Sequence, residues 1–148
     1  MERRIAGFSQ DDAGDWVAHL DCLHRQHVRH QPPFRVAPWV LDDTERAARV
    51  GSAIDCVLCD RAELPDGLSV RRTTPTWDET SMPAALRRAH RVAAGTWGRL
   101  RVEEGRLRFR MATLDTVVEA GGVQPIPPQV DHDVEPDGAV RFFVEFLG

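Results

Sequence analysis

Hydrophobic and polar residues alternate most clearly between residues 97 and 112, where 97–103 and 106–112 flank Glu104-Gly105. The apolar positions fall on one face: Leu100, Val102, Leu107, Phe109 and Met111. The opposite face carries five arginines: Arg99, Arg101, Arg106, Arg108 and Arg110. A period of two is typical of strands with one buried face. The pattern predicts two strands that contribute one face to a core, with the arginines as a solvated outer face or, alternatively, an anion or partner patch.

Short strands separated by Gly and Pro are predicted on both sides of this region. Residues 3–9 and 15–21 flank the turn-forming string Asp11-Asp12-Ala13-Gly14 and predict a β-hairpin. Residues 116–120, 123–126, 130–135 and 140–147 predict further strands. Residues 83–94 favour helix by composition but lead directly into the β region, so we expect mainly strand there. Several short strands in about eighty residues suggest a small barrel or sandwich.

A single short helix is predicted over 44–50, with Asp42, Asp43 or Thr44 as its N-cap and Gly51 as its stop. Residues 26–34 contain Pro32-Pro33, which disfavours a helix and indicates an extended loop. Residues 60–68 are typical of a linker. The predicted fold class is therefore mainly β, with a boundary between residues 61 and 64.

Two cysteine motifs carry the clearest chemistry in the chain. Cys22-Leu23-His24 is followed more than thirty residues later by Cys56-Val57-Leu58-Cys59, and these motifs hold all 3 cysteines. Three thiolates and one imidazole are the soft ligand set that tetrahedral Zn²⁺ prefers. We therefore predict a structural zinc held by Cys22, His24, Cys56 and Cys59.

Other interpretations of this cluster remain open: free thiols, redox cysteines or a metal other than zinc. A C-x-x-C pair can be redox-active, but such pairs usually begin a helix, and we expect none behind Cys59. His19, His27 or His30 could replace His24 as the fourth ligand. About sixty residues with one hairpin and one short helix bury little surface, so loss of the metal should unfold residues 1–60.

Composition and charge narrow the class of protein. The chain is 42% hydrophobic, which is enough for a folded core, and no apolar run reaches the length of a membrane span. The Met-Glu-Arg-Arg start lacks a signal-peptide h-region, and an odd number of cysteines fits a reducing compartment, so we expect a cytoplasmic protein. A net charge of −4 argues against general nucleic-acid affinity, although a local Arg/His patch is not excluded.

The N-terminal part contains a distinctive string, Gln26-His27-Val28-Arg29-His30 followed by Pro32-Pro33. It also contains Arg4-Ile5-Ala6-Gly7-Phe8, Pro38-Trp39-Val40 and Cys56-Val57-Leu58-Cys59-Asp60. On these motifs, nearly all of residues 1–61 resembles a short bacterial zinc-ribbon-like domain of unknown function, and the first string is the most specific part of the resemblance. The family usually has Gly where this chain has Leu23. The resemblance implies metal binding and no established activity.

The C-terminal part contains three distinctive strings: Gly95-Thr96-Trp97-Gly98-Arg99, His132-Asp133-Val134-Glu135-Pro136 and Phe142-Phe143-Val144-Glu145-Phe146. On these motifs, the region of about 64–147 resembles the cupin-like domain of the TehB/YeaR tellurite-resistance group. The resemblance implies a double-stranded β-helix barrel over 64–148, whose interior histidines often hold a divalent metal. His90, His132 and Glu145 are the candidate ligands of this second site, with buried, hydrogen-bonded histidines as the alternative.

The expected function is a two-domain metalloprotein: a zinc module fused to a barrel that binds a metal and a small-molecule or oxyanion ligand, in a tellurite or stress setting. The first alternative is a metal-dependent hydrolytic or O₂-using enzyme with a pocket lined by residues such as Trp97. The second is a regulatory module that contacts a partner through Arg25, Arg29 and Arg35. Methyl transfer is unsupported because no Gly-rich strand-turn-helix is present. A homodimer is a further expectation.

Overall fold

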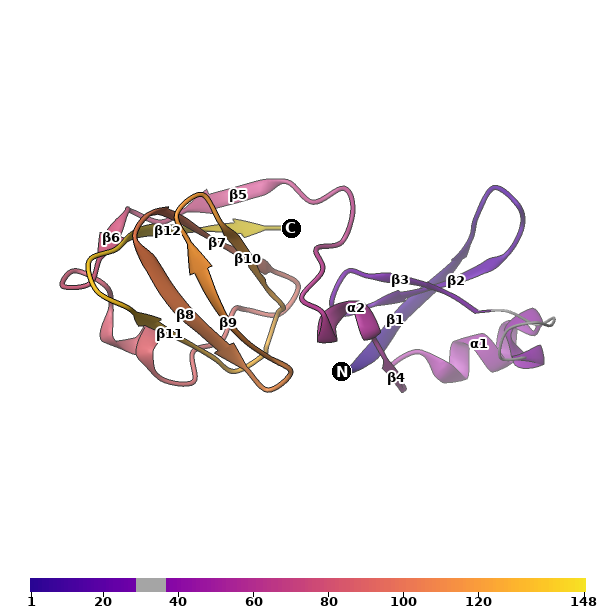
Figure 1. Cartoon of the computed structure of the whole chain (residues 1–148). Coiled ribbons are helices and arrows are strands. Elements are labelled where there is room, and N and C mark those ends of the chain that lie inside the picture. The colour runs from indigo at the N-terminus through magenta and orange to yellow at the C-terminus, as the bar shows by residue number, and fades with distance from the viewer. Residues whose placement is uncertain (29–36) are drawn as a thin grey trace. The chain divides into compact units, whose positions relative to one another are not determined.

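The computed structural model describes residues 1–28 and 37–148, and the chain divides into two compact units, Met1–Val57 and Leu58–Gly148. Both units are built mainly from antiparallel strands, as the sequence predicts (Figure 1). The division falls inside the short helix α2 (Val57–Asp60). None of the helices in the described ranges has the length and apolarity that crossing a bilayer requires.

The N-terminal unit is organised around strand β1 (Glu2–Gln10), which pairs with β2 (Trp16–Leu20) on one side and β4 (Ala53–Asp55) on the other. β3 (Arg25–His27) completes a four-stranded sheet in the order β3-β2-β1-β4. Asp11 closes the hairpin turn because its Oδ1 accepts hydrogen bonds from the N–H groups of Ala13 and Asp15. The predicted hairpin is confirmed. Of the predicted loop over 26–34, residues 29–34 lie outside the described residues.

Helix α1 (Asp43–Arg49) confirms the predicted helix and selects one of its three candidate caps. The Asp42 side chain accepts a hydrogen bond from the N–H of Glu45 at 2.9 Å, which satisfies a donor that the first turn leaves open. Gly51 follows the helix with φ +85, a left-handed conformation in which glycine is unstrained. The short 3₁₀ helix η1 (Pro38–Leu41) precedes α1.

The C-terminal unit contains two antiparallel sheets. The first has the order β10-β7-β12-β5, with β6 also paired to β12, and the second has the order β11-β8-β9. The strands are β5 (Val70–Thr73), β6 (Trp77–Asp78), β7 (Trp97–Glu104), β8 (Arg106–Met111), β9 (Leu114–Glu119), β10 (Val123–Ile126), β11 (His132–Pro136) and β12 (Arg141–Leu147). One hydrophobic core takes residues from both sheets, including Leu100, Phe142, Phe109 and Val134. The two sheets therefore pack face to face.

Strands β7 and β8 follow each other along the chain but join different sheets. The chain changes sheet at Gly105, where φ is +72 and a Cβ atom would lie 2.1 Å from the carbonyl oxygen of Ala139. Only glycine fits this turn. The predicted alternation is nevertheless confirmed, because the core contains every predicted apolar position of the two strands: Leu100, Val102, Leu107, Phe109 and Met111.

The prediction of mainly strand over 83–94 is wrong. Residues Ala84–Arg87 form the 3₁₀ helix η2, and the rest of the segment makes only isolated bridges, from His90 to His132 and from Val92 to Pro128. The segment starts at Pro83 and continues with alanine and leucine, which favour a helical turn over an extended strand. It covers the core with single buried side chains, Leu86 and Val92.

Candidate metal centre

The two cysteine motifs meet because both follow strands that run antiparallel to β1. β2 ends beside the start of β1, with Leu20 opposite Ile5, and β4 ends there too, with Asp55 opposite Glu2. The turn that carries Cys22 and His24 comes directly after β2, and Cys56 comes directly after β4. The N–H of Cys56 donates to the carbonyl of Met1 at 2.8 Å, which ties this motif to the first residue of the sheet.

Four ligand atoms converge at this end of the sheet. Cys22, His24, Cys56 and Cys59 are all buried, with exposed fractions of 0%, 3%, 3% and 0%, and their ligand atoms all lie within 4.8 Å of one another. The Sγ atoms of Cys22 and Cys56 are 3.9 Å apart. His24 Nδ1 lies 3.5 Å from the Cys22 sulfur and 3.3 Å from the Cys56 sulfur.

These separations fit a tetrahedral zinc site. With Zn–S bonds of about 2.3 Å and Zn–N bonds of about 2.0–2.1 Å, tetrahedral geometry separates sulfur from sulfur by about 3.8 Å and sulfur from nitrogen by about 3.5 Å. The distances among Cys22, His24 and Cys56 are close to these values. Three thiolates and one imidazole also fill all four positions, so the cluster has the composition of a closed site.

The electrostatics of His24 show how strongly the cluster attracts a positive charge. Burial lowers the pKa of the imidazole, but hydrogen bonds and charge interactions with the sulfur atoms of Cys22 and Cys56 outweigh burial and raise this pKa to about 9. A cation at this position, whether a proton or a metal ion, is therefore stabilised by the surrounding sulfur atoms. Metal binding exchanges the proton for an ion with a larger charge.

Leu23, between the first two ligands, has a left-handed backbone with φ 71. Its N–H donates to the carbonyl of Leu20 at 2.8 Å, while the N–H of Leu20 donates to the carbonyl of His24 at 2.9 Å. This tight turn aims both Cys22 and His24 at the same point. The family that residues 1–61 resemble usually has glycine at this position. The positive φ accounts for that preference, because glycine adopts a left-handed conformation without strain.

The structure distinguishes His24 from the other candidate histidines. His19 Nε2 lies 2.7 Å from the hydroxyl of Ser9, and His27 Nδ1 lies 3.6 Å from a carboxylate oxygen of Asp11, so both are engaged elsewhere. His30 lies outside the described residues.

A second group of titratable side chains, Asp11, Asp15 and His27, gathers at the hairpin turn. The sequence analysis did not single out this group. Asp11 there already holds the turn together.

The sequence analysis expected no helix behind Cys59, and it did not predict the short helix α2 (Val57–Asp60), which begins inside the C-x-x-C motif and ends one residue after Cys59. The helix is a single turn that starts between the two cysteines and places Cys59 on the same side as Cys56. It is stopped at once, since the N–H of Ala62 donates to the carbonyl of Cys59 and Ala62 has φ 51. This turn brings both thiols to one centre that already contains Cys22 and His24, as a metal site requires.

His90 and His132 lie together in the C-terminal unit. Their backbones form an isolated antiparallel bridge and their rings are in edge contact, with centroids 5.4 Å apart. His132 is 3% exposed, stacks on Phe109 and places Nδ1 3.1 Å from the carbonyl oxygen of Val130. Because a carbonyl only accepts, Nδ1 carries the proton. Burial lowers the pKa of His132, so the ring is neutral at pH 7.

Glu145 does not join these histidines. It lies on the outer face of the first sheet, where Nε of Arg99 and Nε of Arg101 donate to its Oε2 at 2.6 and 2.7 Å. Among the residues that the structure describes, His90, His132 and Glu145 do not form a group whose ligand atoms all lie within 4.8 Å. Trp97, expected to line an enzymatic pocket, is fully buried. The second metal stays a prediction that this arrangement does not support.

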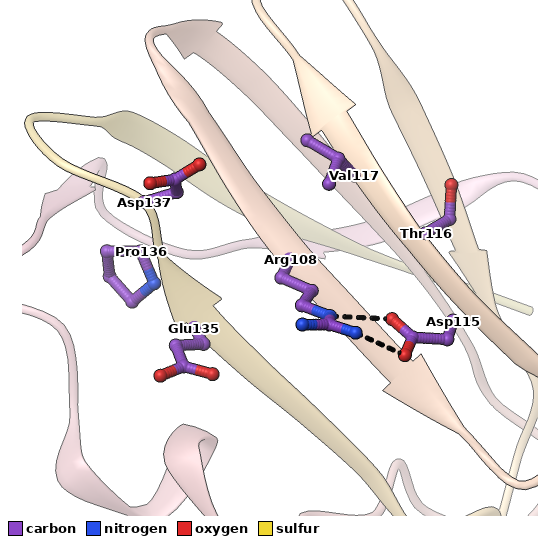
Figure 2. A pocket seen from close by; sticks show the side chains of 7 residues that line it. All are labelled: Arg108, Asp115, Thr116, Val117, Glu135, Pro136 and Asp137. Atoms are coloured by element: carbon purple, nitrogen blue, oxygen red, sulfur yellow. Dashed lines mark hydrogen bonds and ion pairs between the residues drawn. The ribbon is translucent and has the colours of Figure 1, made fainter.

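A pocket of about 760 Å³ lies on the outer face of the second sheet, lined by Arg108, Asp115, Thr116, Val117, Glu135, Pro136 and Asp137 (Figure 2). Arg108 makes two hydrogen bonds to Asp115, at 2.8 and 2.6 Å. Glu135 pairs with Arg110, and Asp137 pairs with Arg106. The charged groups of this pocket are therefore matched one to one.

Two family models match the chain, each over one part of it. A family described as a protein of unknown function (DUF3565) matches residues 6–63, and a TehB-like domain matches residues 72–144. No curated protein is similar enough to the chain to count as a match. The order of the two matches agrees with the two resemblances seen in the sequence.

Solved structures match a little more than half of the chain at the level of fold. TehB from Haemophilus influenzae has a TM-score of 0.52 and 23% sequence identity, over 55% of this chain and 32% of that chain. A structural-genomics target from Escherichia coli strain K12 has a TM-score of 0.50 and 23% identity, over 58% of this chain and 87% of that chain. This chain thus spans about a third of TehB. It joins a segment matching DUF3565 to a segment matching the TehB-like domain.

Proposed function

We propose that the chain is a zinc-binding protein in which Cys22, His24, Cys56 and Cys59 hold one structural Zn²⁺. The observation that carries the proposal is the convergence of four buried ligand atoms within 4.8 Å of one another. Buried thiols and an imidazole at tetrahedral spacing favour zinc over harder ions such as Mg²⁺ or Ca²⁺, which prefer oxygen ligands. The N-terminal unit is then a zinc-ribbon-like module.

The role of this zinc is structural rather than catalytic. A catalytic zinc keeps one coordination position for water or substrate, whereas four protein ligands leave none. All four side chains are also shielded from solvent. The zinc would connect the turn after β2, the end of β4 and helix α2, which the chain brings together from positions 34 residues apart. Because the thiols must stay reduced to bind zinc, we place the protein in the cytoplasm.

The C-terminal unit is proposed to be a cupin-like double-stranded β-helix barrel. Two antiparallel sheets that share one core, and the fold likeness to TehB, support this proposal. The unit would bind a small ligand, in a tellurite-resistance or other stress setting that rests on family resemblance alone. Metal-dependent catalysis at His90, His132 and Glu145 is not part of the proposal, since Glu145 is held by two arginines.

The zinc proposal is tested by measuring metal content per chain. Untagged full-length protein, dialysed against a competing chelator, is analysed by elemental mass spectrometry beside Cys59→Ser, His24→Ala and the control His19→Ala. We expect one zinc per chain in the wild type and in the control, and loss of zinc from the other two variants. His19 is the matched control because it is a nearby histidine outside the cluster. Equal zinc content in all four proteins, or none in any, would refute the proposal.

A further inference from the structure

Two arginines share a single carboxylate on the outer face of the first sheet of the C-terminal unit. Arg99 and Arg101 lie on β7, and Glu145 lies opposite Arg99 on β12. Each arginine uses Nε to donate to the same oxygen, Oε2, at 2.6 and 2.7 Å. Burial raises the pKa of Glu145, but the two hydrogen bonds outweigh it and hold this pKa below its usual value. The three side chains together carry one net positive charge.

The arginines of the second sheet are arranged differently. Arg108 uses both Nε and Nη2 on Asp115, so its guanidinium edge is occupied and its charge is neutralised (Figure 2). Arg106 and Arg110 each face one carboxylate as well. In the parts of the chain that the structure describes, Glu145 is the hydrogen-bonding partner of Arg99 and Arg101, and it engages only their Nε atoms. Their Nη groups therefore remain available to a ligand.

The pair is also held in place and partly shielded from water. The side chain of Glu145 is 15% exposed, that of Arg99 22% and that of Arg101 40%. Side chains in register across neighbouring strands share a face, which brings Val123 and Phe143 beside Arg101 and puts Thr73 beside Glu145. Apolar neighbours weaken the screening of the charges, and the shared carboxylate fixes the two guanidinium groups before any ligand arrives.

We propose that Arg99 and Arg101 form a binding site for a small oxyanion of the phosphate or sulfate class, oriented by Glu145. A guanidinium group presents its N–H donors in a planar fork that matches the oxygens of such an anion, and charge-assisted bonds of this kind are strong. An anion held by the Nη groups of both arginines balances the excess charge that Glu145 leaves. The site is independent of the zinc cluster, since it shares no residue with it.

Inorganic phosphate is the probe. In ¹⁵N-labelled, zinc-loaded full-length protein, the Nε–Hε resonances of the arginines are followed during titration with sodium phosphate, and separately with sodium chloride at the same ionic strength. We expect the Arg99 and Arg101 signals to shift together along one saturating curve, with half-saturation on the order of millimolar. Chloride should produce no saturating shift, and the Arg108 signal should stay in place in both titrations.

Three variants test the assignment. Arg99→Gln and Arg101→Gln should each weaken phosphate binding at least tenfold, because each removes one of the two forks, whereas Arg108→Gln should bind phosphate like the wild type. Far-UV circular dichroism checks that each variant is folded. If a variant does not fold, the phosphate and chloride titrations of the wild-type protein still test the proposed site. Shifts of equal size at Arg99, Arg101 and Arg108, identical shifts with chloride, or no shift at all would overturn the proposal.

Discussion

The two units of the chain bury very different kinds of side chain. The aromatic residues among the largest fully buried side chains all belong to the C-terminal unit: Trp97, Phe109 and Phe142. Among the described residues of the N-terminal unit, the fully buried side chains of that group are Val40 and Cys22, and the remaining buried residues are aliphatics such as Ile5 and Val17, Cys56, and the polar residues Arg3, His24 and Arg46. The C-terminal unit has a hydrophobic core of its own. The N-terminal unit instead supplies three of the four clustered ligands, Cys22, His24 and Cys56, and the fourth, Cys59, lies just past the division between the units.

This difference indicates two separate sources of stability. Burial of a large side chain contributes about 1.5–3 kcal/mol, and the C-terminal core contains many such residues. A unit of fewer than sixty residues buries a smaller share of its surface and often needs a disulfide or a metal. None of the three cysteines forms a disulfide, so of these two means a bound metal is the one that this cluster offers. Removing the metal should therefore leave the C-terminal unit folded, and weakening the hydrophobic core should leave the N-terminal unit folded.

The largest effect is expected from losing the metal. Structural zinc contributes about 10–16 kcal/mol of apparent binding energy, comparable to the whole stability of a typical domain. Cys56→Ser, or removal of zinc by a chelator, should therefore unfold the N-terminal unit and leave the C-terminal unit folded. Amide NMR spectra report both units at once. Persistence of the dispersed signals of 1–28 after complete zinc removal would show that the small core suffices.

The converse perturbation is a cavity in the C-terminal core. Phe109 is fully buried and touches His132, so Phe109→Ala should destabilise this unit by about 3–5 kcal/mol. Zinc content should not change. Urea unfolding, followed through signals of each unit separately, measures the effect. Leu41→Ala, at a side chain that is 57% exposed, serves as the control and should cost little. Loss of zinc from Phe109→Ala would contradict independent stabilisation.

A smaller effect is expected from pH. Burial lowers the pKa of His132 in the folded state below the ordinary value of 6.5. The unfolded chain therefore binds the proton more readily than the folded chain does. The free energy of unfolding of the C-terminal unit keeps its full value above about pH 6.5 and decreases as pH falls from there toward the folded pKa of His132. The loss is at most about 1.4 kcal/mol per pH unit. Urea unfolding of the C-terminal unit between pH 7 and 5 should show it, and His132→Gln should flatten the dependence. If the free energy of unfolding of His132→Gln depended on pH as steeply as that of the wild type, the pH dependence would come from other groups.

The smallest effect is expected at Leu23. Its left-handed φ of 71 costs a non-glycine residue about 1–2 kcal/mol, and its side chain is 38% exposed. Leu23→Gly removes that strain but increases the entropy of the unfolded chain, so a net stabilisation of about 1 kcal/mol or less is expected. Leu23→Val, with a branched Cβ, should destabilise instead. Thermal unfolding of the zinc-loaded protein ranks the three, and a Gly variant less stable than Val would show that the turn is not strained.

Much of the local structure could be predicted because it depends on nearby residues. The alternation of apolar and polar residues predicted which side chains of β7 and β8 face the core, and the turn-forming string from Asp11 to Gly14 predicted the first hairpin. The N-cap and stop of α1 could be located to within two residues. In contrast, residues 83–94 carry no strong pattern, and their composition and their neighbourhood point in opposite directions. There the local helical propensity prevailed.

For the candidate site, the sequence by itself determined the ligand types and their grouping, because two ligands two or three residues apart can reach one ion from a single turn. Only the tertiary structure decided that His24, and not His19 or His27, lies with the three thiols. It also decided that Glu145 faces Arg99 and Arg101 instead of the histidines. Spacing along the chain governs what one turn can place together. Which strands pair, and which faces then meet, depends on hydrogen bonds and packing between residues far apart in sequence.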